Sequence, residues 1–441
     1  MAYGKPLGAG PAMKVAVLGL WHLGTITAAC VADAGVVTVG IDDDAKVIAK
    51  LAAGEPPLYE PGLAELVQQG LSSGRLSFAT DAAALADANI VWVCHDTPVD
   101  DDDRADVDVV LRKVEAIFPH LKNGSVVLVS AQLPVGTVAR LDQSFAAQAN
   151  GRQVDFASSP ENLRLGRAIE IFRNPGRIVV GIRHEHTRDR LSPLLSKFCQ
   201  NLIWMSVESA EMVKHSLNAF LALSITFTNE LAAIAERVGA NASDIETALR
   251  SDPRVGQSAY VKAGPAFAGG TLARDVQFLS SIAEREKLRT PLIGNIIASN
   301  RAHGQWSIDQ LRRRLGPLSG KTIAVLGLSY KAGTDAIRRS PSIELLRALL
   351  TDGATVKVYD PTVRTVPDEF SGVSIADDAK GAILGADAVV VATEWPQFRE
   401  LVVKDFTGAM KGHLVLDPGA FLSPALREVR NLTVVSIGCP A

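Results

Sequence analysis

Short apolar runs alternate with longer stretches of helical character along the first half of the chain. The first run, MKVAVLGLWHLG, ends in a glycine, and four more follow it: VVTVGID, NIVWVCH, SVVLVS and VDFASSP. The first run has the length and apolar character of a parallel strand that is buried on both faces, and the other four are further candidate strands. The alternation predicts an α/β fold with a doubly wound parallel sheet.

The same pattern returns near the C-terminus. The run KTIAVLGLSYKAG, at residues 321–333, closely matches the first one, and TVKVYDP, AVVVATE and HLVLDPG follow it. We therefore predict two Rossmann-like doubly wound parallel-sheet domains.

A long apolar segment separates the two sets of strands. Residues 206–239, SVESAEMVKHSLNAFLALSITFTNELAAIAERVG, contain no proline and no glycine before the last residue, and their apolar positions fall on more than one face. This pattern predicts a long central helix that joins the two domains and must bury its apolar surface against them or against a second subunit. We predict a homodimer built around this helix, and domains at residues 1–205, 206–310 and 311–441.

Bulk composition limits the possible partners. With 441 residues the chain is too long for one compact core. A formal net charge of −3 gives no basic excess for nucleic acid. The N-terminal residues lack the apolar core of a signal peptide, and no later apolar run is expected to reach membrane-spanning length, so we expect a cytoplasmic protein that does not bind membranes. The four cysteines have no paired spacing and no histidine–carboxylate cluster accompanies them, so we expect buried thiols and no metal site.

The first glycine turn has most of a dinucleotide fingerprint. Gly19 and Gly24 occupy the first and third glycine positions, whereas Trp21 occupies the second. Asp42 ends the next predicted strand, where a carboxylate accepts hydrogen bonds from a ribose 2′-hydroxyl and repels a 2′-phosphate. The turn therefore favours NAD over NADP, although taken alone it is equally consistent with a Rossmann-like domain that has lost its cofactor.

Lys214 and Asn218 are four residues apart on the predicted central helix and share a face with Glu211. An ammonium and an amide that project together can stabilise the alkoxide formed when an alcohol is oxidised. A solvated helix face is the alternative explanation for the same spacing.

A series of motifs then follows in order along the chain. They are PLYEPGL (57–63), DTP and ADVD (96–108), LPVGT (133–137), PENLRLGRA (160–168), AEMVKHSLNAFLA (210–222), DPRVG (252–256), GPAFAGG (264–270) and GLSYKAGTDAIRRSPS (327–342). Together they resemble the UDP-glucose/GDP-mannose dehydrogenase family, the nucleotide-sugar dehydrogenases, over nearly the whole chain.

The resemblance implies an enzyme that oxidises the primary alcohol of a sugar nucleotide to a carboxylate with two NAD molecules and a cysteine thioester. It implies that Glu161 handles protons and water during thioester hydrolysis. Lys214 and Asn218 correspond to the pair that holds the oxyanion, and Asp275 to the aspartate that orients the catalytic water.

The resemblance also implies binding residues. Lys331 and Arg338 correspond to contacts with the diphosphate and sugar, a role that suits their charge, and Arg254 to an arginine contributed across the dimer. The implied cofactor contacts are Gly19, Trp21, His22, Leu23, Gly24, Asp42, Thr97 and Gln132, and the implied substrate contacts are Asn162, Leu163, Arg164, Arg254, Tyr260, Gly264, Phe267, Lys331 and Arg338. For the charged residues, a surface ion pair or a helix-end charge is the alternative.

One position departs sharply from the family pattern. The segment GPAFAGGTLARD aligns without a gap, and the position of the catalytic cysteine falls on Thr271. Further departures are Gln132 for threonine, Asn162 for an aromatic residue, Arg274 for lysine, and the segment 94–96, Cys-His-Asp, for small residues. All are expected near the cofactor or the reacting carbon.

A threonine hydroxyl is a poor nucleophile without a base within hydrogen-bonding distance, so the thioester route is expected to be impaired or absent. A single oxidation to an aldehyde or ketone, two oxidations through a hydrated aldehyde, and epimerisation with retained NAD all stay open. Cys94 is a weaker candidate for a displaced nucleophile, and His22 and His95 could carry protons or merely fill space. A non-catalytic sugar-nucleotide-binding protein is the alternative of another class, but it would have no use for the retained catalytic set.

Overall fold

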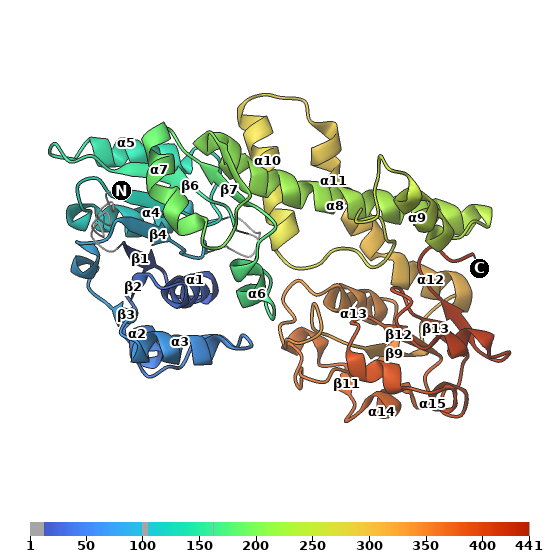
Figure 1. The fold of residues 1–441 in the computed structure, drawn as a ribbon. Helices are drawn as coiled ribbons and strands as arrows, with labels where there is room; N and C mark the ends of the chain where they lie inside the picture. Colours follow the sequence, from blue (N-terminus) through green and yellow to red (C-terminus); the bar gives the residue numbers. More distant parts are fainter. Residues whose placement is uncertain (1–12, 99–104, 162, 441) are drawn as a thin grey trace, which may run out of the picture. The chain divides into compact units, whose positions relative to one another are not determined.

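The computed structural model describes residues 13–98, 105–161 and 163–440 (Figure 1). The predicted substrate residue Asn162 lies outside these residues. The chain divides into two compact units, Met1–Ser216 and Leu217–Ala441, which are described one at a time.

The first unit is built on an eight-stranded sheet with the order β3-β2-β1-β4-β5-β6-β7-β8. Its strands are β1 (Lys14–Leu18), β2 (Val37–Ile41), β3 (Leu76–Ala79), β4 (Ile90–Val93), β5 (Val126–Val129), β6 (Asp155–Ser158), β7 (Ile178–Gly181) and β8 (Leu202–Met205). The first six run parallel in the Rossmann order, and β7 pairs with β6 in the antiparallel direction.

Helices cover both faces of this sheet, which explains why strands such as β4 and β5 are buried throughout. Helices α1 (His22–Asp33), α3 (Leu63–Ser72), α6 (Ala168–Arg173) and α7 (Glu185–Leu195) pack on one face, with α2 (Ala45–Ala52) beside them. Helices α4 (Val107–Ala116) and α5 (Thr137–Ala146) pack on the other face, with the 3₁₀ turns at Ala82–Leu85 and Phe118–His120.

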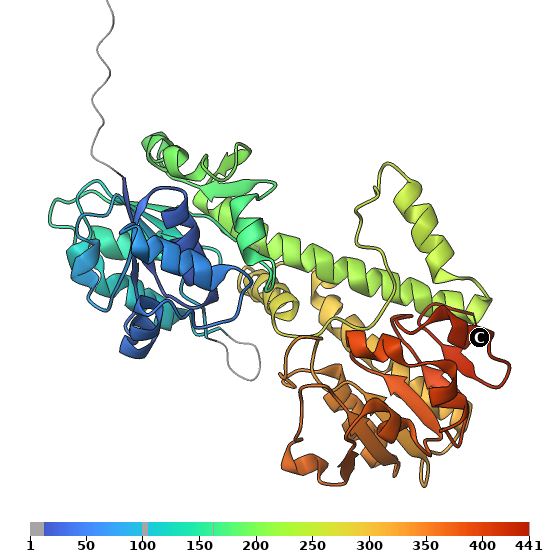
Figure 2. The same ribbon diagram turned by 60° about the horizontal axis from the view of Figure 1, so that its bottom comes forward.

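The second unit contains a six-stranded parallel sheet with the order β11-β10-β9-β12-β13-β14. Its strands are β9 (Thr322–Leu326), β10 (Thr355–Tyr359), β11 (Val373–Ile375), β12 (Ala388–Val391), β13 (Leu414–Leu416) and β14 (Thr433–Val435). Figure 2 shows it in orange and red. Helices α12 (Trp306–Leu315) and α13 (Pro341–Thr351) pack on one face, and α14 (Ala379–Ile383) and α15 (Val403–Thr407) pack on the other. The strand order repeats that of the first unit, so the predicted pair of Rossmann-like sheets is confirmed.

The predicted central helix is also confirmed. Helix α8 (Val207–Val238) contributes residues through Ser216 to the first unit and the remainder to the second. In the second unit, α10 (Thr271–Arg285) and α11 (Pro291–Gly304) pack against α8 through a small apolar cluster, and α9 (Ala242–Ser251) follows it in the chain.

The expectation that no apolar run reaches membrane-spanning length is wrong for helix α8, which by length and composition alone is long and apolar enough to cross a membrane. A core helix of a soluble protein has the same properties. Three of its polar side chains bond to other segments of the fold, namely Glu211 to Gly136, Lys214 to Glu161 and Asn218 to Asp275. These bonds are typical of a helix inside a folded domain, and the absence of membrane binding stays a prediction.

Candidate active site

The glycine turn after β1 has the geometry that a dinucleotide requires. Gly19 has φ +83°, and a Cβ there would lie 2.4 Å from Nδ1 of His95. A Cβ on Gly24 would lie 1.8 Å from the Gly19 carbonyl oxygen, so α1 can pack against the turn only if residue 24 is glycine. The amide of Leu20 donates to Oδ2 of Asp42 over 2.7 Å, which fixes the carboxylate at the end of β2.

The N-terminus of α1 suits a pyrophosphate. Its N-cap residue is Trp21, whose side chain makes no capping hydrogen bond, and the first turn holds no acidic residue. The first amides of the helix are therefore not used by a local cap and can bind an anion. The Trp21 side chain is 47 % exposed, so the residue in place of the second glycine is not buried in the turn. These residues fit NAD.

The second copy of the turn begins in the same way. The Gly327 amide donates to the Tyr359 carbonyl and the Leu328 amide to Oδ2 of Asp360, both over 2.7 Å. The equivalent amides of the first turn, Gly19 and Leu20, make the same two bonds. Asp360, however, is 1 % exposed, and Oδ2 also accepts from Nε1 of Trp395 over 3.0 Å. Burial raises the pKa of Asp360, but bonds from backbone amides outweigh burial and hold it below its usual value. This carboxylate is enclosed and saturated, so it cannot accept a ribose.

The segment after the second turn differs as well. Helix α13 begins only at Pro341, whereas α1 begins three residues after its glycine. The intervening loop carries Lys331 and Arg338, and both are exposed. Of the two turns, the first has the features of a dinucleotide site, and the second presents cations suited to a diphosphate.

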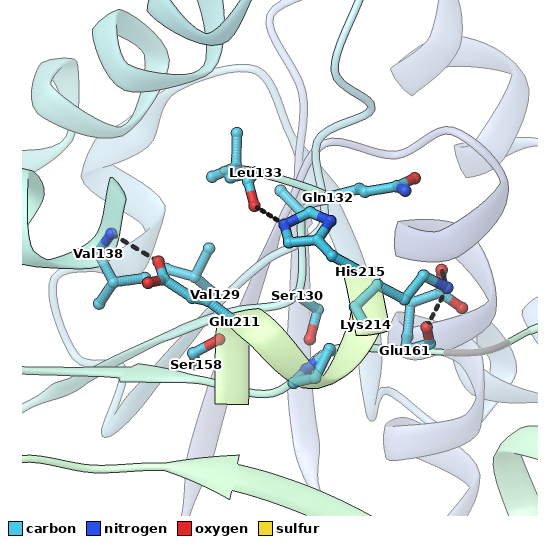
Figure 3. A pocket seen from close by; sticks show the side chains of 12 residues that line it. Val129, Ser130, Gln132, Leu133, Val138, Ser158, Glu161, Glu211, Lys214 and His215 are labelled. Carbon is cyan, nitrogen blue, oxygen red and sulfur yellow. Dashed lines mark hydrogen bonds and ion pairs between the residues drawn. The ribbon is translucent and has the colours of Figure 1, made fainter. Parts of the chain in front are cut away.

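A pocket in the first unit lies where β5 and β6 end (Figure 3). It is lined by Val129, Ser130, Ala131, Gln132, Leu133, Val138, Ser158, Pro160, Glu161, Glu211, Lys214 and His215. Lys214 donates from Nζ to the Glu161 carbonyl oxygen over 2.6 Å, and its Nζ lies 3.8 Å from Oε1 of the same residue. The structure thus joins two of the predicted catalytic residues.

The same pocket contains part of the predicted cofactor site. Thr97 donates from Oγ1 to the Gln132 carbonyl oxygen over 2.8 Å, and Nε2 of His215 lies 3.0 Å from the Leu133 carbonyl oxygen. Glu211 accepts bonds from the Gly136 and Val138 amides at the start of α5. Burial raises the pKa of Glu211, and these two amides act in the opposite direction.

In the second unit, Asn218 and Asp275 form a buried pair. Nδ2 of Asn218 donates to Oδ2 of Asp275, linking α8 to α10. Asp275 is completely buried and Asn218 is 7 % exposed. The helical spacing places Asn218 one turn after Lys214 on α8.

The loop that leads to Thr271 is held at the start and in the middle of its glycine-rich stretch, residues 264–270. The Gly264 amide donates to Oδ1 of Asn229 over 3.0 Å, and Asn300 makes two 2.9 Å bonds with the backbone of Phe267. Thr271 is the first residue of α10, and its side chain is exposed. Among the residues that the structure describes, the Thr271 hydroxyl makes no hydrogen bond, so no base activates it within the second unit.

A pocket next to this loop gathers the predicted residues Tyr260, Gly264 and Phe267. It also contains Arg250 and Lys262, two cations that the sequence patterns did not indicate. Their charge suits a diphosphate.

Models of a single family cover most of the chain. The NAD-binding domain of the UDP-glucose/GDP-mannose dehydrogenase family matches residues 13–199, the central domain 208–302 and the UDP-binding domain 324–424. The chain belongs to this family. It is an NAD-dependent nucleotide-sugar dehydrogenase.

Known proteins are similar over nearly the full length. A UDP-glucose 6-dehydrogenase of Pseudomonas aeruginosa is 32 % identical over 97 % of this chain and 98 % of its own length. A UDP-glucose 6-dehydrogenase of Bacillus subtilis is 33 % identical over 97 % of this chain and 94 % of its own length. The UDP-glucose dehydrogenase structure from Pyrobaculum islandicum has a TM-score of 0.84 at 31 % identity and covers 99 % of this chain and 100 % of that one.

Neither Cys94 nor His95 is suited to chemistry in this dehydrogenase. Cys94 is 1 % exposed, and burial raises the pKa of its thiol, so it does not form a nucleophilic thiolate near neutral pH. Burial, assisted by Lys113, lowers the pKa of His95 to about 4, so its imidazole is neutral at pH 7. Both residues pack against the glycine turn. Cys94 is therefore poorly suited to act as a displaced nucleophile, and the role of His95 as a proton carrier stays a prediction.

The lowered pKa of His95 predicts a specific acid sensitivity. In the unfolded chain His95 has a pKa near 6.5, so it becomes protonated at a higher pH than in the folded chain. Protonation therefore favours the unfolded chain, and the free energy of unfolding decreases as the pH falls from about 6.5 toward 4. We expect His95→Gln to reduce the drop in melting temperature between pH 7 and pH 5 that the parent protein shows. An unchanged drop would contradict the assignment, and His413→Gln, at an exposed position, serves as the control.

The remaining predicted binding residues lie at the surface. Arg254 is exposed and pairs with Asp252 of its own turn over 2.7 Å, and Arg164 is exposed beside the half-buried Leu163. Their roles stay predictions. Glu60 was not singled out from the sequence, although it sits in the PLYEPGL motif; it is buried and bonded to the 166–168 backbone.

Proposed function

We propose that this protein oxidises the primary alcohol of a UDP-hexose to a carboxylate with NAD and without a covalent thioester. The feature that carries the proposal is Thr271, to which the resemblance of GPAFAGGTLARD to the family pattern assigns the position of the catalytic cysteine. Its side chain is exposed, and its hydroxyl has no hydrogen-bonded base in the described part of the second unit. The UDP-binding domain and the UDP-glucose 6-dehydrogenases among its relatives support the choice of substrate.

The chemistry balances without a nucleophile on the protein. The alcohol loses its hydroxyl proton and, from carbon, a hydride that NAD accepts, which leaves an aldehyde. Water adds to the aldehyde to give a hydrate. Loss of a second hydride and further protons gives the carboxylate, so two NAD are reduced and one water is consumed for each sugar.

The retained residues supply the remaining functions. The Lys214 ammonium, held on the Glu161 carbonyl, stabilises the negative charge that develops on the alcohol oxygen. The Glu161 carboxylate accepts protons, including that of the hydrate. In the second unit, the buried Asn218–Asp275 pair keeps the amide and carboxylate with which the family holds the oxyanion and orients the catalytic water.

The proposal is tested by supplying purified protein with NAD and UDP-glucose, other UDP-hexoses and GDP-mannose, and following absorbance of reduced cofactor. Reduction with a UDP-hexose supports the proposal. Stabilisation by ligands without NAD reduction would contradict it and indicate a binding protein.

We further propose that two copies associate through α8. Phe220, Phe227 and Ile234 recur at seven-residue spacing on this helix and are 63 %, 51 % and 59 % exposed, and Val238 near its end is 72 % exposed. Exposed large apolar side chains that recur along one helix in this way are typical of an interaction surface.

A charge in the middle of this set of apolar side chains should separate the copies. We expect Phe227→Glu to shift the protein from dimer to monomer in light scattering at micromolar concentration, because the carboxylate would be buried without a partner. The exposed Gln277→Glu on α10 is the matched control. A parent protein that is monomeric, or a dimer unaffected by the change, would rule out this surface.

A further inference from the structure

Two buried carboxylates outside the predicted catalytic set each accept two backbone hydrogen bonds from a loop of the candidate site. Glu211, 6 % exposed, accepts from the Gly136 amide over 2.7 Å and the Val138 amide over 2.9 Å. Glu60, 4 % exposed, accepts from the Gly166 amide over 2.7 Å and the Ala168 amide over 2.8 Å. We refer to each carboxylate with its two amides, two residues apart, as a clasp.

The clasps lie where the two loops of the pocket end. Residues 130–136 connect β5 to α5 and carry Gln132, and residues 159–167 connect β6 to α6 and carry Glu161. Neither α5 nor α6 has a side-chain cap from its own N-cap residue. The first amides of both helices therefore depend on a glutamate that is distant in sequence.

The glutamates come from elements that carry other site residues. Glu211 lies one turn before Lys214 on α8. Oε2 of Glu60 lies 3.5 Å from Nε2 of His22, the first residue of α1 in the cofactor turn. One clasp thus ties the Gln132 loop to the helix of Lys214, and the other ties the Glu161 loop to the cofactor turn.

We propose that Glu60 and Glu211 are positioning residues that set the two loops of the active site separately, Glu211 on the cofactor side and Glu60 on the substrate side. The proposal rests on the proposed function. A buried carboxylate accepts both amides, whereas a glutamine presents an NH₂ to one of them and leaves a buried donor unpaired. The loop is then released from one of its two anchors while the neighbouring residues keep their packing.

The test compares Glu60→Gln and Glu211→Gln with NAD and UDP-glucose as probes. We expect Glu60→Gln to raise KM for UDP-glucose about tenfold, and to raise KM for NAD less, by about threefold, because Glu60 also contacts His22 of the cofactor turn. We expect Glu211→Gln to lower kcat and raise KM for NAD, each about tenfold. The matched control for Glu211 is Glu208→Gln on α8, since the Glu208 side chain pairs with Arg183 at the surface. The matched control for Glu60 is Glu55→Gln, since Glu55 is exposed in the same segment between α2 and α3.

Hydrogen exchange of backbone amides provides a readout that general destabilisation does not produce. Exchange should accelerate at Gly136 and Val138 only in Glu211→Gln, and at Gly166 and Ala168 only in Glu60→Gln. Should a glutamine variant fail to fold, the aspartate variant, which keeps the charge but shortens the reach, is compared in the same way.

Two results would overturn the proposal: unchanged exchange at the four amides, or equal changes of both KM values in both variants. If the parent protein oxidises no UDP-hexose, the proposed function fails, and the exchange experiment still decides whether the clasps hold the loops.

Discussion

The Thr271→Cys variant should gain a covalent route that the parent protein lacks. A cysteine at this position would begin α10, where the helix N-terminus lowers the pKa of a thiol and favours the thiolate. We expect the second oxidation to accelerate by about tenfold or more, because a thiolate captures the aldehyde more readily than water does. During turnover, a substrate-derived adduct should appear on residue 271 by peptide mass spectrometry.

The matched control is Thr271→Ser, which keeps a hydroxyl and should show neither the acceleration nor the adduct. Iodoacetamide should inactivate only the cysteine variant, since Cys94 is buried with a raised pKa. A cysteine variant with parent kinetics and no adduct would show that residue 271 does not face the reacting carbon.

The Lys214→Ala variant should lose oxidation while still binding both ligands. Removing the ammonium deletes the donor that stabilises the developing alkoxide, so we expect kcat to fall about 10²- to 10³-fold. Dissociation constants for NAD and the UDP-sugar, measured by calorimetry, should change by no more than about threefold, because the interaction is made mainly in the transition state.

Lys197→Ala, which removes an exposed lysine whose Nζ donates to the Ala34 carbonyl, controls for loss of charge. Turnover that survives in Lys214→Ala would remove this lysine from the reaction. A loss of binding that matches the loss of turnover would assign it to ground-state contacts instead.

The features of the fold that follow from local sequence were predictable. The strands β1, β2, β4 and β5 lie in runs that are mostly apolar, β6 (DFAS) was predicted from a weaker run, and α8 lacks helix breakers over its length. The short strands β3 (LSFA) and β11 (VSI) are interrupted by serine, so they have no comparable apolar signal, whereas β8 (LIWM) is apolar but was not among the predicted strands. The reversal at β7 depends on tertiary pairing with β6 and not on any local pattern.

The residues of the candidate site were likewise predictable where they depend on local sequence and not where they depend on contacts between distant residues. The spacing of Lys214 and Asn218 and the glycines of the first turn are visible in the sequence because they depend on helix and turn geometry. The clasp of Glu60 joins residues that are 106 positions apart in the sequence. The hydrogen bond from Trp395 to Asp360, which distinguishes the second glycine turn from the first, joins residues that are 35 positions apart. Such contacts are decided by the folded chain, so a single sequence did not reveal them.

The most direct test of the central claim follows the parent protein during turnover with NAD and a UDP-hexose. Reduced cofactor is counted against product while the intact protein is weighed by mass spectrometry. Our account predicts two reduced NAD per sugar, a product that has gained one oxygen and lost two hydrogens, and protein of unmodified mass throughout. A sugar-nucleotide adduct on the protein would contradict the route without a thioester, and an isomeric product with no net NAD reduction would show that the protein is an epimerase.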